Sequence, residues 1–493
     1  MKRNALIRCA AWLLTLCAVM PMAISCGDDS GKNPTHTTAN KEADTIDEND
    51  PYADRLAISD DLGEYDFNKY QYRIITADER GSDFYMEGES ADNVESAVYR
   101  RNRAVEERFN CEIVLLGDAF YTETANRINK DITSGDDLID LVAHHVVSLG
   151  LLVGSELFLN WYDIPNINFD KPWWSDSNEE LLTHSGVCFM AVGDLALSSM
   201  YQSYATFYNK RLGADYDMPD LFEVVNNGEW TIDTIISYSK DIYQDLNMDG
   251  KVDAESDLFG YASDYSSRYT YIMSFDNPIY RVNNGSLELV LRTDKLSSIY
   301  AKLVDEFNIY RGVQTVYKNG VGMSPVEIFA EGRAMFINAP INAALELRDM
   351  EDDYSILPMP KWDEAQEEYI TMADGNHNAL AIPVTVQNLE AVGTITEALS
   401  AESYKIVFPA YYDVALKVKG TRDPESIKML DRIVESSAFD FGYIYDGWKG
   451  FAVMLYSQLT SNSKNIESAY ERYERSSLRW YNSLLEVFEN YEG

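Results

Sequence analysis

The sequence has few basic residues for its length. Of 493 residues, 41 are Lys or Arg and 81 are Asp or Glu, which gives a formal net charge of −40. Binding to phosphate backbones depends on clusters of basic side chains that release counterions, so this balance argues against a nucleic-acid partner. It also argues against docking on anionic lipid through a basic patch.

Cysteine is also scarce. Five are present, and no C-x-x-C pair occurs among them, so a structural zinc site or a thioredoxin-type motif has no support. Three of the five lie within the first 26 residues. The other two, Cys111 and Cys188, lie in short apolar runs that are typical of buried strands. We therefore predict two separate buried thiols rather than a disulfide.

The first 25 residues have the pattern of a signal peptide. Basic residues come first, and an apolar run from Cys9 to Met20 follows that is too short to span a bilayer. The small residues directly before Cys26 resemble the lipobox of bacterial lipoproteins, with Ala23 at the position where leucine is usual. That resemblance implies that residues 1–25 are removed and that Cys26 carries lipid. The alternative is an ordinary secretory peptide cut near Ser25.

The segment after Cys26 is poor in apolar residues. Residues 27–50 contain no Leu, Val, Phe, Trp or Tyr, so they cannot bury enough apolar surface to offset their ordering entropy. We predict that residues 26–64 are the lipidated cysteine and a disordered acidic tether. Such an anchor would hold the protein at the extracellular face of the cell membrane, which is the periplasmic side in a Gram-negative host. No later stretch reaches about 18 consecutive apolar residues.

The rest of the chain has enough apolar residues for a large core, because 46% of the sequence is hydrophobic and it includes 34 Tyr, 19 Phe and 8 Trp. Tyr72–Ala77 is expected to form a strand, 94–109 a helix capped by Asn93, and 111–116 a second strand. This β-α-β order predicts an α/β fold with parallel strands. Further strands are expected at 137–142, 187–192, 205–208, 334–337 and 354–357, and further helices at 230–243, 296–307, 326–330 and 466–488.

One acidic loop has the pattern of a calcium site. Calcium binds six to eight oxygen atoms, and in this loop oxygen-bearing residues alternate before a glycine that allows a tight turn. Ser256 stands where an EF-hand has its closing Glu, and Asp257 follows it. We predict a structural calcium site and no catalytic cofactor. The predicted ligands are Asp245, Asn247, Asp249, the Lys251 carbonyl, Asp253 and Asp257. The alternative is a surface turn without an ion.

Enzyme signatures are missing from the sequence. There is no G-x-S-x-G, H-E-x-x-H or G-x-x-x-x-G-K-[ST], and no carboxylate pair can be singled out among 81 acids. Aromatic clusters remain, and they are Trp161-Tyr162, Trp173-Trp174, Tyr411-Tyr412, and Tyr443 and Tyr445 with Trp448. Aromatic rings can stack on the apolar faces of sugars while carboxylates and amides bind the hydroxyl groups. The alternative for each of them is packing in the core.

Several segments resemble the extracellular solute-binding proteins of bacterial ABC importers, in the carbohydrate-binding branch that includes maltose-binding protein. They are Phe207–Lys210, Asn227–Thr231 before a helix, Phe329–Met335, Tyr354–Pro360 and Leu380–Pro383. Each motif is weak alone, but their order along residues 65–493 is fairly specific. The acidic loop is similar to a calcium-loop insertion found in this family.

The resemblance implies a two-lobed periplasmic-binding-protein-like fold with crossover hinge strands and a ligand cleft. It assigns residues 65–193 and about 375–410 to the first lobe, and 194–374 and about 411–493 to the second. Crossovers are expected near 192–205 and 372–382. The expected ligand contacts are Trp448, Asp194 and Asp374 by their order in the chain, Trp173 and Trp174 by position on the first lobe, and Tyr412.

The implied function is capture of a sugar or oligosaccharide by a monomer that delivers it to the transmembrane subunits of an ABC permease, without catalysis. The alternatives are a secreted glycan-degrading enzyme and a surface glycan-binding protein without a permease. A peptide or another polar solute could also replace the sugar.

Overall fold

The computed structural model describes residues 52–492, apart from residues 118, 284–285, 310–322 and 422. The predicted signal peptide, Cys26 and most of the predicted tether lie outside the described residues. Within the described part of the chain, none of the helices combines the length and apolar character needed to cross a membrane.

The first lobe is built on a four-stranded sheet with the order β11-β3-β1-β2. The strands are β1 (Tyr70–Ile75), β2 (Cys111–Leu115), β3 (Leu141–His145) and β11 (Asn378–Ala381). β1 is parallel to both β2 and β3, so the predicted β-α-β unit is confirmed, and β11 is antiparallel to β3. The helices of this lobe are α2 (Gly81–Phe84), α3 (Asn93–Phe109), α4 (Tyr121–Thr133), α5 (Val146–Val153), α6 (Ser177–Glu180) and α15 (Leu389–Glu402).

Some strands and helices begin at other residues than predicted, because local side-chain contacts set where they start. The third strand begins at Leu141 rather than at residue 137, because Arg73 binds the carboxylates of Asp137 at 2.5 Å and Asp140 at 2.7 Å and holds this segment beside the strand. Asp92, not Asn93, caps α3. The expected strand at 187–192 is reduced to isolated bridges. Cys111 and Cys188 are buried and free, as predicted.

The second lobe is built on a four-stranded sheet with the order β5-β8-β4-β9. Its strands are β4 (Tyr204–Asn209), β5 (Phe259–Ala262), β8 (Ala334–Pro340) and β9 (Tyr354–Leu357), and β6 (Tyr280–Asn283) pairs with β7 (Ser286–Leu289) in a separate hairpin. Its helices are α8 (Lys210–Asp215), α9 (Leu221–Asn226), α10 (Ile232–Ser239), α11 (Tyr265–Ser274), α12 (Asp294–Ile309), α13 (Pro325–Ala330), α14 (Ala343–Glu346) and α16 (Pro424–Glu435).

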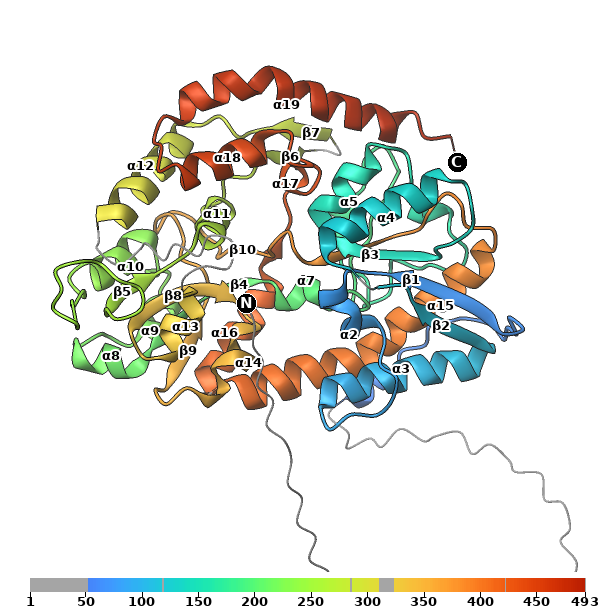
Figure 1. The fold of residues 1–493 in the computed structure, drawn as a ribbon, viewed down its shortest axis with the longest axis horizontal. Helices are drawn as coiled ribbons and strands as arrows, with labels where there is room; N and C mark the ends of the chain where they lie inside the picture. Colours follow the sequence, from blue (N-terminus) through green and yellow to red (C-terminus); the bar gives the residue numbers. More distant parts are fainter. Residues whose placement is uncertain (1–51, 118, 284–285, 310–322, 422, 493) are drawn as a thin grey trace, which may run out of the picture. The chain divides into compact units, whose positions relative to one another are not determined.

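The chain passes between the lobes at several places. The first passage contains α7 (Ser198–Tyr201), and the second joins β10 (Thr371–Met372) to β11. The two passages touch where the Asp374 amide donates to the Gln202 carbonyl at 3.0 Å. β12 (Ser437–Ala438) lies parallel to β10. After α15 the chain continues as π-helical turns over Ser403–Val407 and Ala410–Gly420 and reaches the second lobe, where the Tyr354 hydroxyl donates to the Gly420 carbonyl at 2.5 Å (Figure 1).

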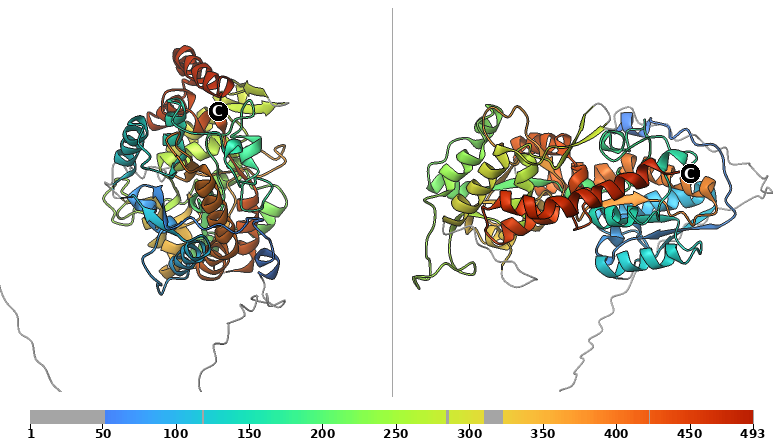
Figure 2. Two further views of the ribbon diagram at one scale, coloured as in Figure 1. Left: turned by 90° about the vertical axis from the view of Figure 1, so that its right-hand side faces the viewer. Right: turned by 90° about the horizontal axis from the view of Figure 1, so that it is seen from above.

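The C-terminal helices also connect the lobes. They are α17 (Phe441–Ile444), α18 (Phe451–Thr460) and α19 (Ile466–Glu489). The start of α19 lies at the second lobe, where Glu467 pairs with Arg292 at 3.1 Å. Its end lies at the first lobe, where the rings of Phe488 and Phe189 are 4.9 Å apart. Figures 1 and 2 show this helix, in red, running from one lobe to the other.

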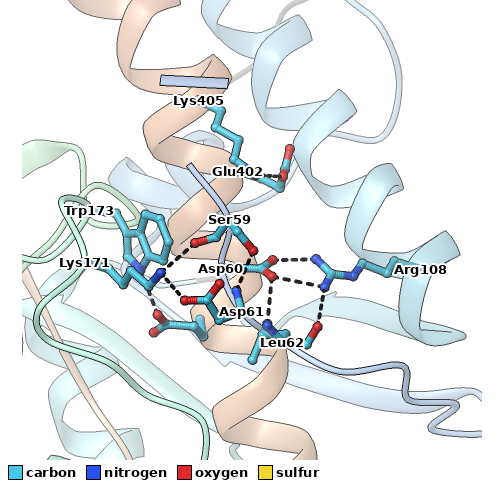
Figure 3. Close-up of polar contacts among 10 residues, drawn as sticks. Ser59, Asp60, Asp61, Leu62, Arg108, Lys171, Trp173, Glu402 and Lys405 are labelled. Carbon is cyan, nitrogen blue, oxygen red and sulfur yellow. Dashed lines mark hydrogen bonds and ion pairs between the residues drawn. The ribbon is translucent and has the colours of Figure 1, made fainter. Parts of the chain in front are cut away.

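Residues 52–64, which the composition assigned to the tether, are packed on the first lobe and begin with the short helix α1 (Ala53–Leu56). We call residues 53–64 the strap. Asp60 pairs with Arg108 of α3 at 2.5 Å, and Asp61 pairs with Lys171 at 2.5 Å (Figure 3). Burial raises the pKa of Asp60, but the hydrogen bonds from Arg108 and the Leu62 amide, together with the positive charges of Arg108 and Lys405, outweigh it, so the pKa is below its ordinary value. The carboxylate is therefore held in its charged form.

Candidate functional site

A cavity of about 270 Å³ lies between the two lobes. The first lobe contributes residues from α4, β3 and α5, the second contributes residues from α11, and the second passage and the C-terminal helices complete the wall. Rings and polar groups line it together. The aromatic residues in its wall are Tyr121, Tyr269, Tyr443, Trp448 and Tyr456, and the polar ones include His145, Ser148, Thr270, Asp374 and Asn376.

On the first-lobe side, His145 ends β3 and stacks on Tyr121, with ring centroids 4.7 Å apart. Its side chain is 5% exposed, and among the described residues Nε2 has no hydrogen-bond partner. Glu79 Oε1 is 3.6 Å from Nε2, beyond hydrogen-bond range. Burial lowers the pKa of His145 to about 3, so the ring is neutral at pH 7. Nε2 is therefore a buried polar atom of a wall residue, and its hydrogen-bonding capacity is unused among the described residues.

Asp374 lies at the second passage between the lobes. This passage falls within the predicted crossover near 372–382, and it also lines the cavity. Burial raises the pKa of this carboxyl to about 6, although the hydrogen bond from the Asn376 amide acts in the opposite direction and lowers it. Next to it, the Gly375 amide donates to the Tyr443 hydroxyl at 3.1 Å. Asp374 and Asn376 thus present oxygen and nitrogen atoms beside an aromatic ring, which is the combination that binds polyols.

Trp448 lies between α17 and α18 and is 51% exposed. Its backbone has a φ of 56°, in the left-handed region that a bulky residue adopts rarely. Strained backbone of this kind persists where the surrounding structure imposes it, and it concentrates at functional sites. Tyr456 of α18 packs edge-on against the indole, with centroids 6.0 Å apart. The ring is therefore held at the cavity while much of its surface stays open to solvent.

The structure brings Trp448 and Asp374 to this cavity but places Asp194 elsewhere. Asp194 and Trp174 line a separate cavity of about 360 Å³ beside the first passage. Burial raises the pKa of Asp194 to about 7. Trp174 is 4% exposed and Trp173 is fully buried, and their indole nitrogens donate to the two oxygens of Glu397 at 2.9 and 3.1 Å. Both tryptophans therefore pack within the first lobe, away from the cavity that holds Trp448.

Tyr412 also lies away from this cavity. It is in the π-helical segment Ala410–Gly420, where its hydroxyl donates to Asp431 at 2.8 Å and Lys417 lies over its ring at 4.3 Å. Asp431 belongs to α16, so these contacts join the segment to the second lobe, and they use both the hydroxyl group and one face of the Tyr412 ring.

The predicted calcium loop forms a turn stabilised by its own side chains. The Asp245 carboxylate accepts from the Gly250 amide at 2.8 Å, and Asn247 and Asp249 accept from later amides of the loop. Asp257 is fully buried, and its Oδ2 accepts from the Asp253 amide and the Tyr243 hydroxyl. Its Oδ1 has no hydrogen-bond partner among the described residues. Across all the residues that the structure describes, no group of three or more His, Cys, Asp or Glu side chains is arranged to hold a metal ion.

A wider groove of about 1000 Å³ lies on other residues between β6, α16 and the segment before β10. Its wall carries the charged residues Glu180, Asp276, Arg281, Glu367, Glu368, Arg432 and Glu435. The groove also carries the rings of Tyr280, Tyr369 and Phe439, but its charged side chains are strongly hydrated and compete with ring stacking. The smaller cavity, enclosed by aromatic rings, is the better candidate site.

Sequence reasoning did not select most of the residues around the cavity. Tyr121, His145, Tyr269 and Tyr456 were not predicted as contacts, and Tyr443 was considered only as a member of the aromatic cluster that contains Trp448. His145 carries one usable signal, because it ends a strand of an α/β sheet, and ligands bind beyond the carboxyl ends of such strands. Tyr121, Tyr269 and Tyr456 carry none, since the sequence contains 34 tyrosines and most have ordinary packing roles.

The fold is that of the two-lobed substrate-binding proteins of ABC transporters. One similar solved structure is an ABC substrate-binding protein from Listeria monocytogenes in complex with cycloalternan, with a TM-score of 0.56, 12% identity, and coverage of 84% of this chain and 99% of that chain. Another is a cyclo/maltodextrin-binding protein complexed with maltotetraose, with a TM-score of 0.54, 13% identity, and coverage of 87% and 98%. No family model and no curated protein matches the sequence. The similarity to these two solved structures confirms the predicted fold class.

Proposed function

We propose that this protein binds a sugar or oligosaccharide in the cavity between its lobes and delivers it to the permease of an ABC importer. One observation carries the proposal. Five aromatic rings, His145 and Asp374 line the same cavity, and Nε2 of His145 has no hydrogen-bond partner among the described residues. Rings supply stacking surface, and the polar groups supply hydrogen bonds that a hydroxyl-bearing ligand would complete. The ligands named in the two similar structures, cycloalternan and maltotetraose, support the same class.

A thermal-shift screen tests this proposal. The panel contains linear oligosaccharides of two to six rings, in α-1,4-glucose, β-1,4-glucose and β-1,4-mannose series, with peptides of two to six residues as the comparison set. A ligand at 100 times its Kd stabilises the native state by about 2.7 kcal/mol, which is readily seen as a higher Tm. Trp448→Ala should abolish the shift. A shift with peptides and with no oligosaccharide would contradict the sugar assignment.

Delivery rather than degradation is the proposed role, and the similar structures support it because both are binding proteins rather than enzymes. The two roles, delivery and degradation, can be separated by experiment. The purified protein is incubated with each oligosaccharide that binds, and new reducing ends are measured. Product formation would favour the alternative of a secreted glycan-degrading enzyme. If the ligand is bound unchanged, but cells that lack this protein take it up as well as the wild type does, the protein is a surface glycan binder.

We also propose that Cys26 is lipidated after removal of residues 1–25 and holds the protein at the extracellular face of the membrane as a monomer. The basis is the apolar run followed by small residues and a cysteine. Cys26→Ala should move the protein from the membrane fraction to the aqueous fraction. Fractionation that is the same for the variant and the wild type would rule out the anchor.

Calcium binding at Asp245–Asp257 is a separate structural proposal. The alternating oxygen donors and the unpartnered Oδ1 of buried Asp257 support it. Titrating the chelated protein with Ca²⁺ should raise its Tm, and Asp249→Ala should remove that increase. A Tm that is unchanged by Ca²⁺ would leave the loop as a surface turn.

A further inference from the structure

Three large aromatic side chains in the described residues are exposed, and two of them adjoin the same cavity. Trp448 is 51% exposed and lines it, and Phe120 is 59% exposed and directly precedes Tyr121 in its wall. The third, Tyr162, is 44% exposed and lies elsewhere on the first lobe, in edge-on contact with Phe169. Exposed rings beside a binding cavity are candidates for contact with the same ligand.

The rings on the first-lobe side form a continuous row from solvent to core. The Phe120 and Tyr121 centroids are 4.6 Å apart, those of Tyr121 and His145 are 4.7 Å apart, and those of His145 and His144 are 5.3 Å apart. His144 is fully buried. Phe120 is therefore the outer end of a row whose next two members line the cavity.

Phe120 has no local structural reason to be aromatic. It is the N-cap residue of α4, a position where Ser, Thr, Asp and Asn are preferred because their side chains accept hydrogen bonds from the first amides of the helix. Phe120 makes no such bond, and most of its ring is not packed. A residue that violates a local preference and gains little packing is expected where function requires it.

We propose that Phe120 is an outer platform on which one further sugar ring stacks, beyond those enclosed by the cavity. The site then takes a linear oligosaccharide with one end extending past Tyr121 toward solvent, rather than a single enclosed monosaccharide. This inference rests on the proposed sugar-binding function and adds the requirement for chain length.

The test measures Kd by calorimetry for oligosaccharides of two to six rings in whichever series of the panel binds the wild type. Phe120→Ala should weaken binding of the longer members by about 3- to 10-fold, as expected for loss of one ring contact, and leave the shortest member within twofold. Phe120→Trp keeps an aromatic ring at this position, so its Kd should depend on oligosaccharide length as the wild-type Kd does. Tyr162→Ala, the matched loss of an exposed ring away from the cavity, should change no Kd.

A second variant separates binding from folding. Phe120→Ser supplies the missing cap, so its Tm should rise by about 1–2 °C while the affinity for longer oligosaccharides falls. Misfolding would lower both quantities. An equal loss of affinity at every length, or no loss at any length, in Phe120→Ala would overturn the outer platform while leaving sugar binding intact. Failure of the wild type to bind any oligosaccharide would overturn both proposals.

Discussion

At the scale of single residues, Gly375 shows how tightly the cavity wall is built. A Cβ at this position would lie 2.6 Å from Val147 Cγ2 and closer still to the Tyr443 hydroxyl, and both of those residues line the cavity. Gly375→Ala should therefore push Tyr443 away, destabilise the protein by about 1–3 kcal/mol and weaken ligand binding. Denaturant unfolding and calorimetry measure the two effects. Gly88→Ala is the control, since a methyl group at that position would meet no atom within 4 Å beyond its own residue and its two chain neighbours.

Asp374 should make ligand binding depend on pH. Its pKa of about 6 is raised above the ordinary 3.8 by burial, and a sugar hydroxyl donating to the ionised carboxylate would lower it again. Binding then releases a proton, so affinity should increase as pH rises from 5 to 7, by up to about tenfold, and be level above that. His145, with a pKa of about 3, does not titrate in this range.

The matched variant for this effect is Asp374→Asn, which keeps the shape of the side chain and removes its titration. Its Kd should be the same at pH 5 and pH 7. A wild-type Kd that does not change over this interval would mean that Asp374 does not accept a hydrogen bond from the ligand.

Residue identity alone predicts contacts poorly, and the tryptophans show why. Trp173 and Trp448 are equally plausible as stacking residues in the sequence, but Trp173 is fully buried with its nitrogen bound to Glu397, whereas Trp448 is half exposed at the cavity. The difference depends on Glu397, which is more than 200 residues away from Trp173 in the chain. The role of Trp448 in binding stays a prediction.

At the scale of elements, α19 is the helix that periodicity predicted best, from 466 to 488 against the observed Ile466–Glu489. Periodicity gives the buried face but not the partner. The partner is a surface made by both lobes, and the contact of Trp480 with Gly154 of the first lobe is an example. Strand ends were predicted less well, because polar side chains such as Arg73 and Asp140 set where β3 begins.

Trp480 should be one of the links between α19 and the first lobe, beside the Phe488–Phe189 contact. Its indole nitrogen donates to the Tyr445 carbonyl at 2.7 Å, its ring faces Gly154, and Lys449 lies over it at 4.3 Å. Trp480→Ala should cost about 2–3 kcal/mol of unfolding free energy through lost packing and the unpaired carbonyl. Arg479→Ala, an exposed neighbour on the same helix, should cost less than about 0.5 kcal/mol. Equal effects of the two substitutions would show that α19 is not fixed through Trp480.

At the scale of the whole molecule, the net charge of −40 should make stability depend on salt. Self-repulsion of like charges destabilises a compact state, and the Debye length falls from about 30 Å at 0.01 M to about 8 Å at 0.15 M ionic strength. The Tm in chelated buffer should rise by a few degrees over this interval. KCl and tetramethylammonium chloride should act alike, because the effect is screening. A falling Tm would mean that ion pairs such as Arg73–Asp140 outweigh the repulsion.

The two-lobed architecture itself was predictable, because the order of several weak motifs along 65–493 constrains the fold more than any one of them does. The cavity was not, since its wall combines residues from both lobes and from the C-terminal helices, and sequence order does not reveal how such distant segments meet.

The strap has a mechanical consequence. Any tension that reaches the folded part from the chain before Ala53 must pass through residues 53–64, and these are clamped to the first lobe by Asp60–Arg108 and Asp61–Lys171. The load is therefore borne by the first lobe, near the C-terminal end of α3. Neither ion pair involves a residue of the second lobe.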